Sequence, residues 1–457
     1  MTGDILRVLI ALGAILLAGH GGVCWLGKGA AISWPERLGL SWLLGAGFVS
    51  VALPLLGFFA RGAVLIGAVA ACAFALFVMS RKSRFAPAQR DALSPLEWLL
   101  VAALFGQAVF LAWWTPQTVL GWDGLIIWES KARFAFLNGG VLPVSYFQDA
   151  SRMWTQPHYP LLLPGVETWL YLWLGRADEA WARLPGVLFY LAAVGILSGA
   201  CGRLGGSRTA GLAVAVAMFF VPYHFAGTWG VLSGYADFPL GVLWLAAVSW
   251  LLALPDDAAA VRFAAVLGAL LVWMKREGVF PWITLVLVAA VLLWRAKRLR
   301  AVLWIAAPGL ALSIGCAMFL SIVKAPADPN YLPLTFENLV TRADRIGLIA
   351  AYMGGEILNF ESWSLLWIGA FPAIAIQFLR QRRHAFVLAA ALAGPLPGFA
   401  LAFMLSNFGA LPAHLDLALP RLLLQLAPTA LLAIALAIPQ ISLVNSSSTS
   451  ESRTPDP

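Results

Sequence analysis

Charged residues are scarce in this chain of 457 residues. Asp, Glu, Lys and Arg make up 11% of the sequence, whereas ordinary globular domains carry about 25%. Hydrophobic residues make up 61%, and the mean hydropathy is +0.84. Such a composition is not that of a soluble domain, and it predicts an all-α, polytopic transmembrane protein.

Residue patterns that bind zinc or nucleic acid are also missing. The four cysteines (Cys24, Cys72, Cys201 and Cys316) lie far apart in apolar segments, without CxxC or Cys/His spacing. We therefore expect small buried residues at these positions. The net charge of +8 does not indicate a nucleic-acid partner, because most Lys and Arg stand in short runs between apolar segments. Such runs orient a protein in its lipid bilayer.

Long apolar runs recur along the sequence, and a membrane-spanning helix needs about 20 mostly apolar residues. We expect about 13 spans, at 5–26, 38–59, 62–80, 96–115, 184–202, 209–224, 238–254, 261–274, 279–294, 301–323, 363–379, 385–405 and 421–439. The first run lacks a good cleavage signal, so we expect it to remain as a span. A further run, 161–174, is short and lies between prolines and Arg176. Its length favours a segment lying against the membrane surface over a crossing.

The basic clusters predict the orientation of these spans, because Lys and Arg collect on the cytoplasmic side. The clusters stand at 81–84 with Arg90, at 203–208, at 295–300 and at 380–384. If all are cytoplasmic and 161–174 does not cross, the spans alternate without conflict. The connections on the opposite, non-cytoplasmic face are then 116–183, 223–237, 275–278, 324–362 and 406–420.

The first of these connections differs from the rest of the chain in composition. Its stretch 121–168 contains Asp123, Glu129, Lys131, Arg133, Asp149, Arg152, His158 and Glu167, interleaved with Trp122, Trp128 and Trp154. A long polar loop between spans is costly unless it has a function. We divide the chain into an N-terminal three-span region (1–95), a candidate catalytic region (96–440) whose non-cytoplasmic loop 116–183 carries interfacial helices, and a disordered cytoplasmic tail (441–457).

The predicted topology brings further polar residues to the same face. Besides Asp123, Lys131 and His158, these are Tyr235 and Asp237 in GYADFPL, Lys275, Arg276 and Glu277 in KREG, and His414, Asp416 and Arg421 in HLDLALPR. Ionisable residues at membrane depth cost a few kcal/mol unless they are paired or hydrated, so they indicate function. The carboxylates suit a general base for an acceptor hydroxyl. The cations suit phosphate binding, and Trp122 and Trp128 suit stacking on a sugar ring.

Structural interpretations compete with these functional ones. An interfacial aromatic belt would explain Trp122, Trp128, Trp154, Trp169 and Trp173. The KREG residues also fit a solvated turn, and Asp237 fits a carboxylate stabilised by a helix N-terminus. His158 fits a structural role better than that of a metal ligand. Asp123 has the weakest structural explanation, because it stands so close to the end of a span.

Several motifs resemble those of a known family. Asp123 opens the first large non-cytoplasmic loop just after a span, and HYPLLLP (158–164) and ARLPGVLFYL (182–191) follow. This order resembles that of the C-type membrane glycosyltransferases (GT-C), which include protein O-mannosyltransferases, lipid A aminoarabinose transferases and relatives of the lipopolysaccharide-core glycosyltransferases. GYADFPL, KREG and HLDLALPRLLLQLAP (414–428) are similar to elements of further bacterial members. The resemblance covers roughly residues 96–440.

The resemblance implies transfer of a sugar from a polyprenyl-phosphate donor to a periplasmic hydroxyl of a lipid, glycan or protein, usually with inversion. It implies that Asp123 is the catalytic base and that Asp237 is a second acidic residue near the acceptor. The cations available for the lipid phosphate are Lys131, Lys275, Arg276 and Arg421, and the further substrate-binding residues are His158, Tyr235, Glu277 and His414. Gly124 stands where many relatives carry a second acidic residue, which leaves a requirement for a divalent cation open.

Two other functions remain open at this point. A transporter or flippase of a lipid-linked or anionic solute would use the same charges, but it predicts polar residues within spans and broken helices. An O-antigen polymerase or ligase is expected to use an arginine-centred site in one large loop. The clustering of the charges at one end of the spans favours chemistry at the membrane surface, and hence the glycosyltransferase.

Overall fold

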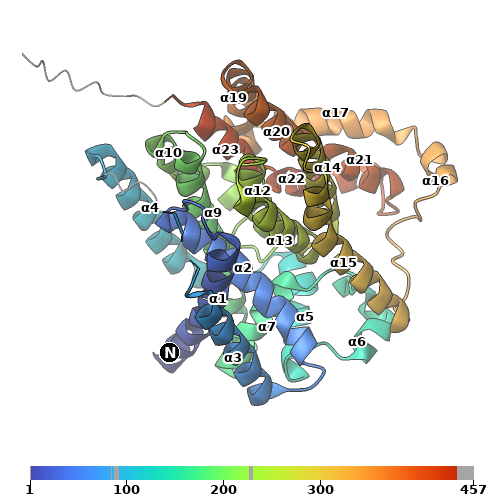
Figure 1. Cartoon of the computed structure of the whole chain (residues 1–457). Helices are drawn as coiled ribbons and strands as arrows, with labels where there is room; N and C mark the ends of the chain where they lie inside the picture. The colour runs from blue at the N-terminus through green and yellow to red at the C-terminus, as the bar shows by residue number, and fades with distance from the viewer. Residues whose placement is uncertain (1, 84, 87–91, 226–229, 440–457) are drawn as a thin grey trace, which may run out of the picture.

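The chain folds into helices only, within the part that the structure describes. That part of the computed structural model is residues 2–83, 85–86, 92–225 and 230–439 (Figure 1). Arg84 and Arg90 of the first basic cluster and the predicted tail 441–457 lie outside these ranges. The prediction of an all-helical, polytopic membrane protein is confirmed by the apolar helices described next.

Eight helical segments among the described residues are long and apolar enough to cross a membrane. They are α1 (Thr2–Leu26), α2 (Trp34–Leu56), α3 (Gly62–Ser80), α4 (Pro95–Trp114) with η1 (Thr115–Gln117), α8 (Glu179–Ala182) with α9 (Leu184–Arg203), η4 (Arg276–Gly278) with α14 (Val279–Arg295), α15 (Arg300–Ile322), and α20 (Arg382–Ala393) with α21 (Leu396–Leu405). A bent pair, α22 (Leu411–Leu424) and α23 (Ala427–Ala437), makes a ninth if it is counted as one span; the bend is 43°.

The other four predicted runs form helices of 11 to 17 residues, which are short for a span. These helices are α10 (Arg208–Met218), α12 (Asp237–Leu251), α13 (Ala258–Met274) and α19 (Leu366–Arg380). Every residue of α12 is buried among other helices, so its hydrophobicity reflects the protein core as much as a bilayer. Helix length therefore supports eight or nine spans, and the full count of 13 is not established.

The connections carry the remaining helices, most of them short. They are η2 (Gly124–Glu129), α5 (Ser130–Leu137), α6 (Val144–Gln148), η3 (Ala150–Thr155), α7 (Leu162–Leu174), α11 (Pro222–Phe225), α16 (Phe336–Thr341), α17 (Arg345–Ile357) and α18 (Phe360–Trp363). α16 and α17 lie at the edge of the molecule (Figure 1), and most of their side chains are at least partly exposed.

α7 corresponds to the short run 161–174, and it lies inside the protein. Of its 13 residues, 12 are buried, and it packs against α1, α2 and α5. The Trp169 indole Nε1 donates a hydrogen bond of 2.9 Å to the carbonyl of Ala11. The prediction of a helix lying on the membrane surface is therefore wrong, because such a helix would keep one face exposed. Apolar runs of this length also occur as buried core helices, which is the case here.

The three N-terminal helices pack closely because glycines stand where they cross. A Cβ atom at Gly19 would lie 1.7 Å from the carbonyl oxygen of Ser41, and one at Gly45 would lie 2.0 Å from that of Ile15. Small residues at such crossings let apolar helices approach to backbone contact. α1, α2 and α3 form one group in Figure 1, and α2 packs this group against α7 and α9.

The basic clusters and the candidate site residues lie at opposite ends of the helices. α14 has 17 residues and thus separates Lys275 from the cluster 295–300 by about 25 Å. At the basic end, the Arg298 Nη1 donates a 2.7 Å hydrogen bond to the carbonyl of Pro255, and Arg383 pairs with Asp256 at 2.5 Å. The loop at 255–257 therefore joins two of the predicted basic clusters at one end of the protein.

A buried ion pair fixes three helices at this basic end. The Arg203 Nη2 lies 2.7 Å from the Glu36 Oε1, and the two side chains are 10% and 0% exposed. The Arg203 guanidinium also covers the Trp250 ring at 3.9 Å. Because Glu36 belongs to α2, Arg203 to α9 and Trp250 to α12, one arginine sets the spacing of all three helices.

Removal of the Glu36 charge tests this assignment. Glu36→Gln leaves a buried guanidinium without its counter-ion, which costs about 3 kcal/mol or more in other proteins. We therefore expect a clear loss of stability, measured as the midpoint of unfolding of the purified protein in detergent. Asp4→Asn is the control, because it breaks the exposed Asp4–Arg176 pair and should change little. Equal effects of the two substitutions would contradict the assignment.

Candidate functional site

Asp237, the first residue of α12, is the centre of the candidate site. Its side chain is fully buried, and the Lys275 Nζ and the Gln425 Nε2 donate to its Oδ1 at 2.7 and 2.8 Å. The Arg421 Nε and Nη2 donate to its Oδ2 at 3.2 and 3.1 Å. Two cations and an amide therefore occupy both carboxylate oxygens, and these charge-assisted hydrogen bonds compensate the cost of burying the charge.

The ends of three helices bring these side chains together. Asp237 stands at the N-terminus of α12, where the helix dipole favours a carboxylate. Lys275 follows the last residue of α13, and Arg421 and Gln425 stand at the end of α22, before the bend into α23. Arg421 and Gln425 are four residues apart, so they share one face of the helical turn.

Arg421 links Asp237 to a second carboxylate, that of Asp123. The Arg421 Nη2 lies 2.7 Å from the Asp123 Oδ2. The Asp123 backbone N–H donates to the Tyr235 hydroxyl at 3.0 Å, and the Arg421 guanidinium lies over the Tyr235 ring at 4.5 Å. The Asp123 side chain is 19% exposed, whereas that of Asp237 is 0% exposed. Asp123 is therefore the carboxylate of this pair that a substrate can reach.

Gly124 allows the first loop to approach the segment around Tyr235. A Cβ atom at Gly124 would lie 2.1 Å from the carbonyl oxygen of Ser233, and the Gly121 N–H donates to that same oxygen at 2.8 Å. The absence of an acidic side chain after Asp123 thus has a steric cause. Gly124 also begins η2, a π-helical turn, and such turns are rare and frequent at functional sites.

The KREG turn is divided between the cluster and the surface. Lys275 is 3% exposed, and its ammonium also lies 3.3 Å from the Glu277 Oε1. Arg276 points away, is half exposed, and pairs with Asp328 at 2.7 Å. The interpretation as a solvated turn therefore fits Arg276 and does not fit Lys275.

The two predicted histidines have their contacts elsewhere. The His158 Nε2 lies 2.6 Å from the carbonyl oxygen of Pro326, which ties the first loop to the connection that follows α15. The His414 Nδ1 lies 2.8 Å from the Ser406 Oγ, and its ring packs between Phe403 and Phe408. Both contacts are those of structural histidines, and neither brings the ring against a carboxylate of the cluster.

Lys131 lies in the first loop and has no exposed surface that a phosphate could contact. Its side chain is fully buried, and its Nζ has no hydrogen-bond partner within the described residues. The rings of Trp128 and Tyr159 lie 5.2 and 5.5 Å from the ammonium. Burial lowers the pKa of Lys131 well below its usual range, and the nearby carboxylates of Glu167 and Asp123 offset this only in part.

The tryptophans of the predicted aromatic belt divide into two groups. Trp122 and Trp154 are 73% and 54% exposed, which fits an anchor at the membrane interface. Trp128 and Trp169 are fully buried, so the belt is the wrong interpretation for them. The same burial removes Trp128 from the residues that could stack on a sugar.

Sequence reasoning missed Gln425, which binds Asp237 directly. A lone glutamine in an apolar helix does not stand out in a sequence, although its spacing of four residues from Arg421 puts the two on one face of the helix. It also missed Tyr159, whose ring faces Lys131 and whose phenol has a pKa raised by burial and by the Glu277 carboxylate. Tyr159 follows His158 in the HYPLLLP motif. The motif therefore supplies the ring that faces Lys131 as well as the histidine that binds the Pro326 carbonyl.

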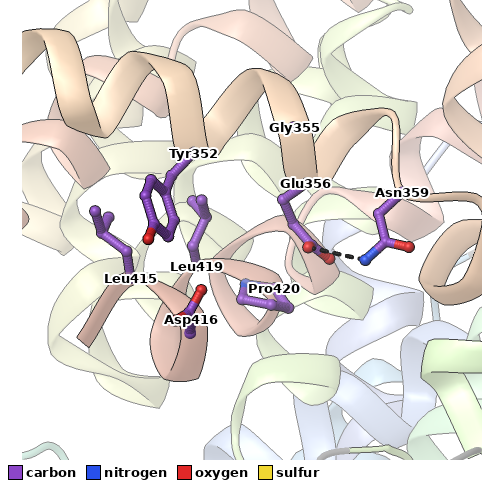
Figure 2. Close-up of a pocket in the computed structure, with 8 residues that line it drawn as sticks. All are labelled: Tyr352, Gly355, Glu356, Asn359, Leu415, Asp416, Leu419 and Pro420. Atoms are coloured by element: carbon purple, nitrogen blue, oxygen red, sulfur yellow. Dashed lines mark hydrogen bonds between the residues drawn. The ribbon is translucent and has the colours of Figure 1, made fainter. Parts of the chain in front are cut away.

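A hollow of about 390 Å³ opens between α17 and α22 (Figure 2). Its lining consists of Tyr352, Gly355, Glu356, Asn359, Leu415, Asp416, Leu419 and Pro420. The Asn359 Nδ2 and the Trp363 Nε1 donate to the Glu356 carboxylate at 3.2 and 2.9 Å, which fixes its position. Because Pro420 has no N–H, the Asp416 carbonyl loses its helical donor. The hollow is therefore lined by the hydrogen-bond acceptors of Glu356 and Asp416 together with the apolar side chains of Leu415 and Leu419.

The carboxylates of the cluster do not fit a divalent cation. Asp237 and Asp123 share Arg421, and Asp237 also binds Lys275, so a metal ion between them would lie beside two cations. No group of three or more His, Cys, Asp or Glu side chains that could hold a metal occurs in the described part of the chain.

The chain matches no protein-family model, no curated protein and no solved structure. The similarity to C-type glycosyltransferases therefore rests on the sequence motifs, and the functional argument rests on the geometry of the cluster.

Lys131→Met tests whether the buried amine lacks a partner. The folded-state pKa of Lys131 lies below its unfolded value of about 10.4, so unfolding takes up a proton at neutral pH. Below the unfolded pKa, the neutral buried amine lowers the free energy of unfolding. This loss of stability shrinks as the pH rises toward the unfolded pKa. We expect Lys131→Met to melt above the wild type at pH 7 in detergent, with the difference narrowing toward about pH 10. The exposed Lys28 provides the control Lys28→Met, and a less stable Lys131→Met would show that the amine has a stabilising partner.

Proposed function

We propose that the protein is a membrane glycosyltransferase of the C type, which transfers a sugar from a polyprenyl-phosphate donor to a hydroxyl of a lipid, glycan or protein. The observation that carries the proposal is the contact between the partly exposed carboxylate of Asp123 and the guanidinium of Arg421. The buried carboxylate of Asp237 binds the same guanidinium. Glycosyl transfer from a lipid phosphate needs a base for the acceptor and a cation for the leaving phosphate. It needs no protein nucleophile.

In this mechanism, Asp123 accepts the proton of the acceptor hydroxyl while the acceptor oxygen attacks the anomeric carbon. The bond between that carbon and the phosphate oxygen breaks, and its electron pair leaves with the prenyl phosphate. As Asp123 becomes neutral, Arg421 loses one of its two anionic partners, while negative charge grows on the phosphate. One guanidinium thus stabilises the charge in both places, which is the kind of preorganised electrostatics that favours a transition state.

Asp237 and Lys275 act as positioning residues in this proposal. Because both oxygens of Asp237 are occupied and the side chain is fully buried, it is poorly placed to accept a proton from substrate. It instead fixes the Arg421 guanidinium. Arg276, half exposed at the same end of the helices, is the cation best placed to meet a lipid phosphate arriving from the membrane.

The hollow between α17 and α22 suits the sugar-bearing part of a substrate. Sugar hydroxyls donate hydrogen bonds, and Glu356, Asp416 and the freed Asp416 carbonyl accept them, while the Tyr352 ring and leucines suit the C–H face of a sugar (Figure 2). Pro420 lines the hollow and Arg421 follows it in sequence. One helix thus carries both the hollow and the cation of the cluster.

The proposal places the cluster at the periplasmic face of a bacterial inner membrane. Its support is the position of the basic clusters at the other ends of the helices, since such clusters mark the cytoplasmic side. A GT-C arrangement would then count the four short helices within the membrane, which gives about 13 spans. The connection 116–183 would be the periplasmic loop that carries Asp123.

A transporter of a lipid-linked or anionic solute is the second candidate, and the bend of 43° between α22 and α23 favours it. The bend follows Arg421 and Gln425, and broken helices beside charged residues are a feature of transporters. Proteoliposomes that move a labelled prenyl-phosphate sugar across the bilayer without forming a glycosylated product would support this candidate over the transferase.

Asp123→Asn tests the catalytic assignment, because the substitution keeps the shape of the side chain and removes its basicity. The wild-type protein in nanodiscs, supplied with a panel of polyprenyl-phosphate sugars and extracted envelope acceptors, should form a glycosylated product. We expect Asp123→Asn to slow transfer by roughly 10²–10⁴-fold, with an unchanged melting profile. Asp149→Asn is the matched control in the same loop, since Asp149 pairs with Arg152 away from the cluster, and it should retain full activity. Wild-type turnover by Asp123→Asn would exclude it as the base.

Charge removal in the hollow tests the sugar subsite. Asp416→Asn and Glu356→Gln each weaken hydrogen bonds from sugar hydroxyls to a charged acceptor, so we expect the KM of the substrate that occupies the hollow to rise by about tenfold. The kcat should change little, because Asp123 and Arg421 are untouched. Glu337→Gln removes an exposed carboxylate of α16 outside the hollow and should leave both constants as they are. A fall in kcat at constant KM would contradict a binding role.

A further inference from the structure

The turn between α14 and α15 holds a lysine in a conformation that normally belongs to glycine. The Lys297 N–H bonds to the Trp294 carbonyl at 2.9 Å and the Arg298 N–H to the Leu293 carbonyl at 2.7 Å, which closes the end of α14. At this position helices commonly carry glycine. Lys297 adopts a φ of 56°, a left-handed conformation that costs an L residue about 1 kcal/mol. Strain of this kind points to a use for the side chain.

Three cations line a hollow of about 470 Å³ at this turn. Its lining consists of Lys297, Arg298, Leu299, Arg300, Ala301 and Trp304. The Arg298 guanidinium is fixed through its bond to the carbonyl of Pro255. No carboxylate within the described residues forms an ion pair with any of the three cations. The basic cluster at 203–208 differs, because Glu36 and Glu97 neutralise its two arginines.

Exposed apolar side chains stand close in sequence to this turn, and one of them, Trp304, lines the hollow. Trp294, Leu303 and Trp304 are 66%, 70% and 72% exposed. Tryptophan concentrates at the level of lipid headgroups, and leucine beyond it suits acyl chains. Exposed apolar side chains of this kind would not strengthen the binding of a free anion from water. Unneutralised cations next to an apolar border complement a molecule that has a phosphate at one end and hydrocarbon at the other.

We propose that this hollow binds the phosphate headgroup of an anionic phospholipid. Lys297 and Arg300 contact the phosphate together with the fixed Arg298, and the acyl chains lie against Trp304 and Leu303. Basic hollows beside membrane helices recognise anionic headgroups in this way. The site is about 25 Å along α14 from the Asp123 cluster, so the inference does not depend on the proposed transferase activity.

The test is lipid titration of the purified full chain in detergent, followed by native mass spectrometry. The probes are phosphatidylglycerol and phosphatidylcholine with the same acyl chains, and inorganic phosphate as the free anion. We expect the protein to retain phosphatidylglycerol in preference to phosphatidylcholine, and excess inorganic phosphate not to displace it. The pair Lys297→Gln and Arg300→Gln should weaken phosphatidylglycerol binding about thirtyfold, since each cation near a headgroup contributes about fivefold. Equal retention of the two lipids, or displacement by phosphate, would overturn the proposal.

Two further variants separate binding from folding. Lys297→Gly removes the charge and relieves the left-handed strain, so it should lower phosphatidylglycerol affinity about fivefold while the Tm stays the same or rises. A destabilised Lys297→Gly would contradict the strain on which the argument begins. Lys28→Gln with Arg382→Gln removes two exposed cations outside the hollow and should keep wild-type affinity. An equal loss in this control would show attraction to the overall charge of the protein and would refute a defined site.

Discussion

The buried carboxylate of Asp237 is the constraint on which the candidate site depends. A fully buried charge costs several kcal/mol unless charged and hydrogen-bonding groups surround it. Here Lys275, Arg421 and Gln425 meet that cost, and they come from the end of α13 and from the bend between α22 and α23. The helix ends must therefore meet at one point for the fold to be stable. An apolar bundle alone would tolerate many ways of packing these helices, and the ion cluster selects one.

The same constraint places the first loop. Arg421, once held by Asp237, presents its Nη2 to Asp123, and the Tyr235 hydroxyl receives the Asp123 backbone N–H. Gly124 lets these segments touch, since any side chain at this position would meet the Ser233 carbonyl. The position of Asp123 is thus set by contacts with residues more than a hundred positions away in sequence. A partly exposed carboxylate that rests on a rigid, charged support is what a positioned base requires.

The sequence predicts those parts of the site that are built from charged residues, because charges contrast with the apolar rest of the chain. Asp123, Asp237, Lys275 and Arg421 stand out because an apolar chain carries so few charges, and the structure brings these four together. Gln425 and, apart from Asp416, the residues that line the hollow do not stand out in the sequence, because their role comes from neighbours on other helices. The burial of α7 and Trp128 inside the protein could not be predicted from the sequence either. Hydrophobicity predicts that a segment avoids water, but it does not distinguish lipid from protein as its surroundings.

The two ends of the bundle use positive charge in opposite ways. At the Asp237 end, each cation of the cluster is matched to a carboxylate, so the local charge is nearly balanced and a small change, such as one proton on Asp123, alters the field at Arg421 strongly. At the turn between α14 and α15, the cations have no acidic partner among the residues that the structure describes, so their charge acts on molecules outside the protein. A balanced cluster suits chemistry that moves a charge, while an unbalanced one suits steady attraction to a charged surface. Both clusters consist of lysine and arginine in the sequence. Only the carboxylates that pack around one of them distinguish the balanced cluster from the unbalanced one.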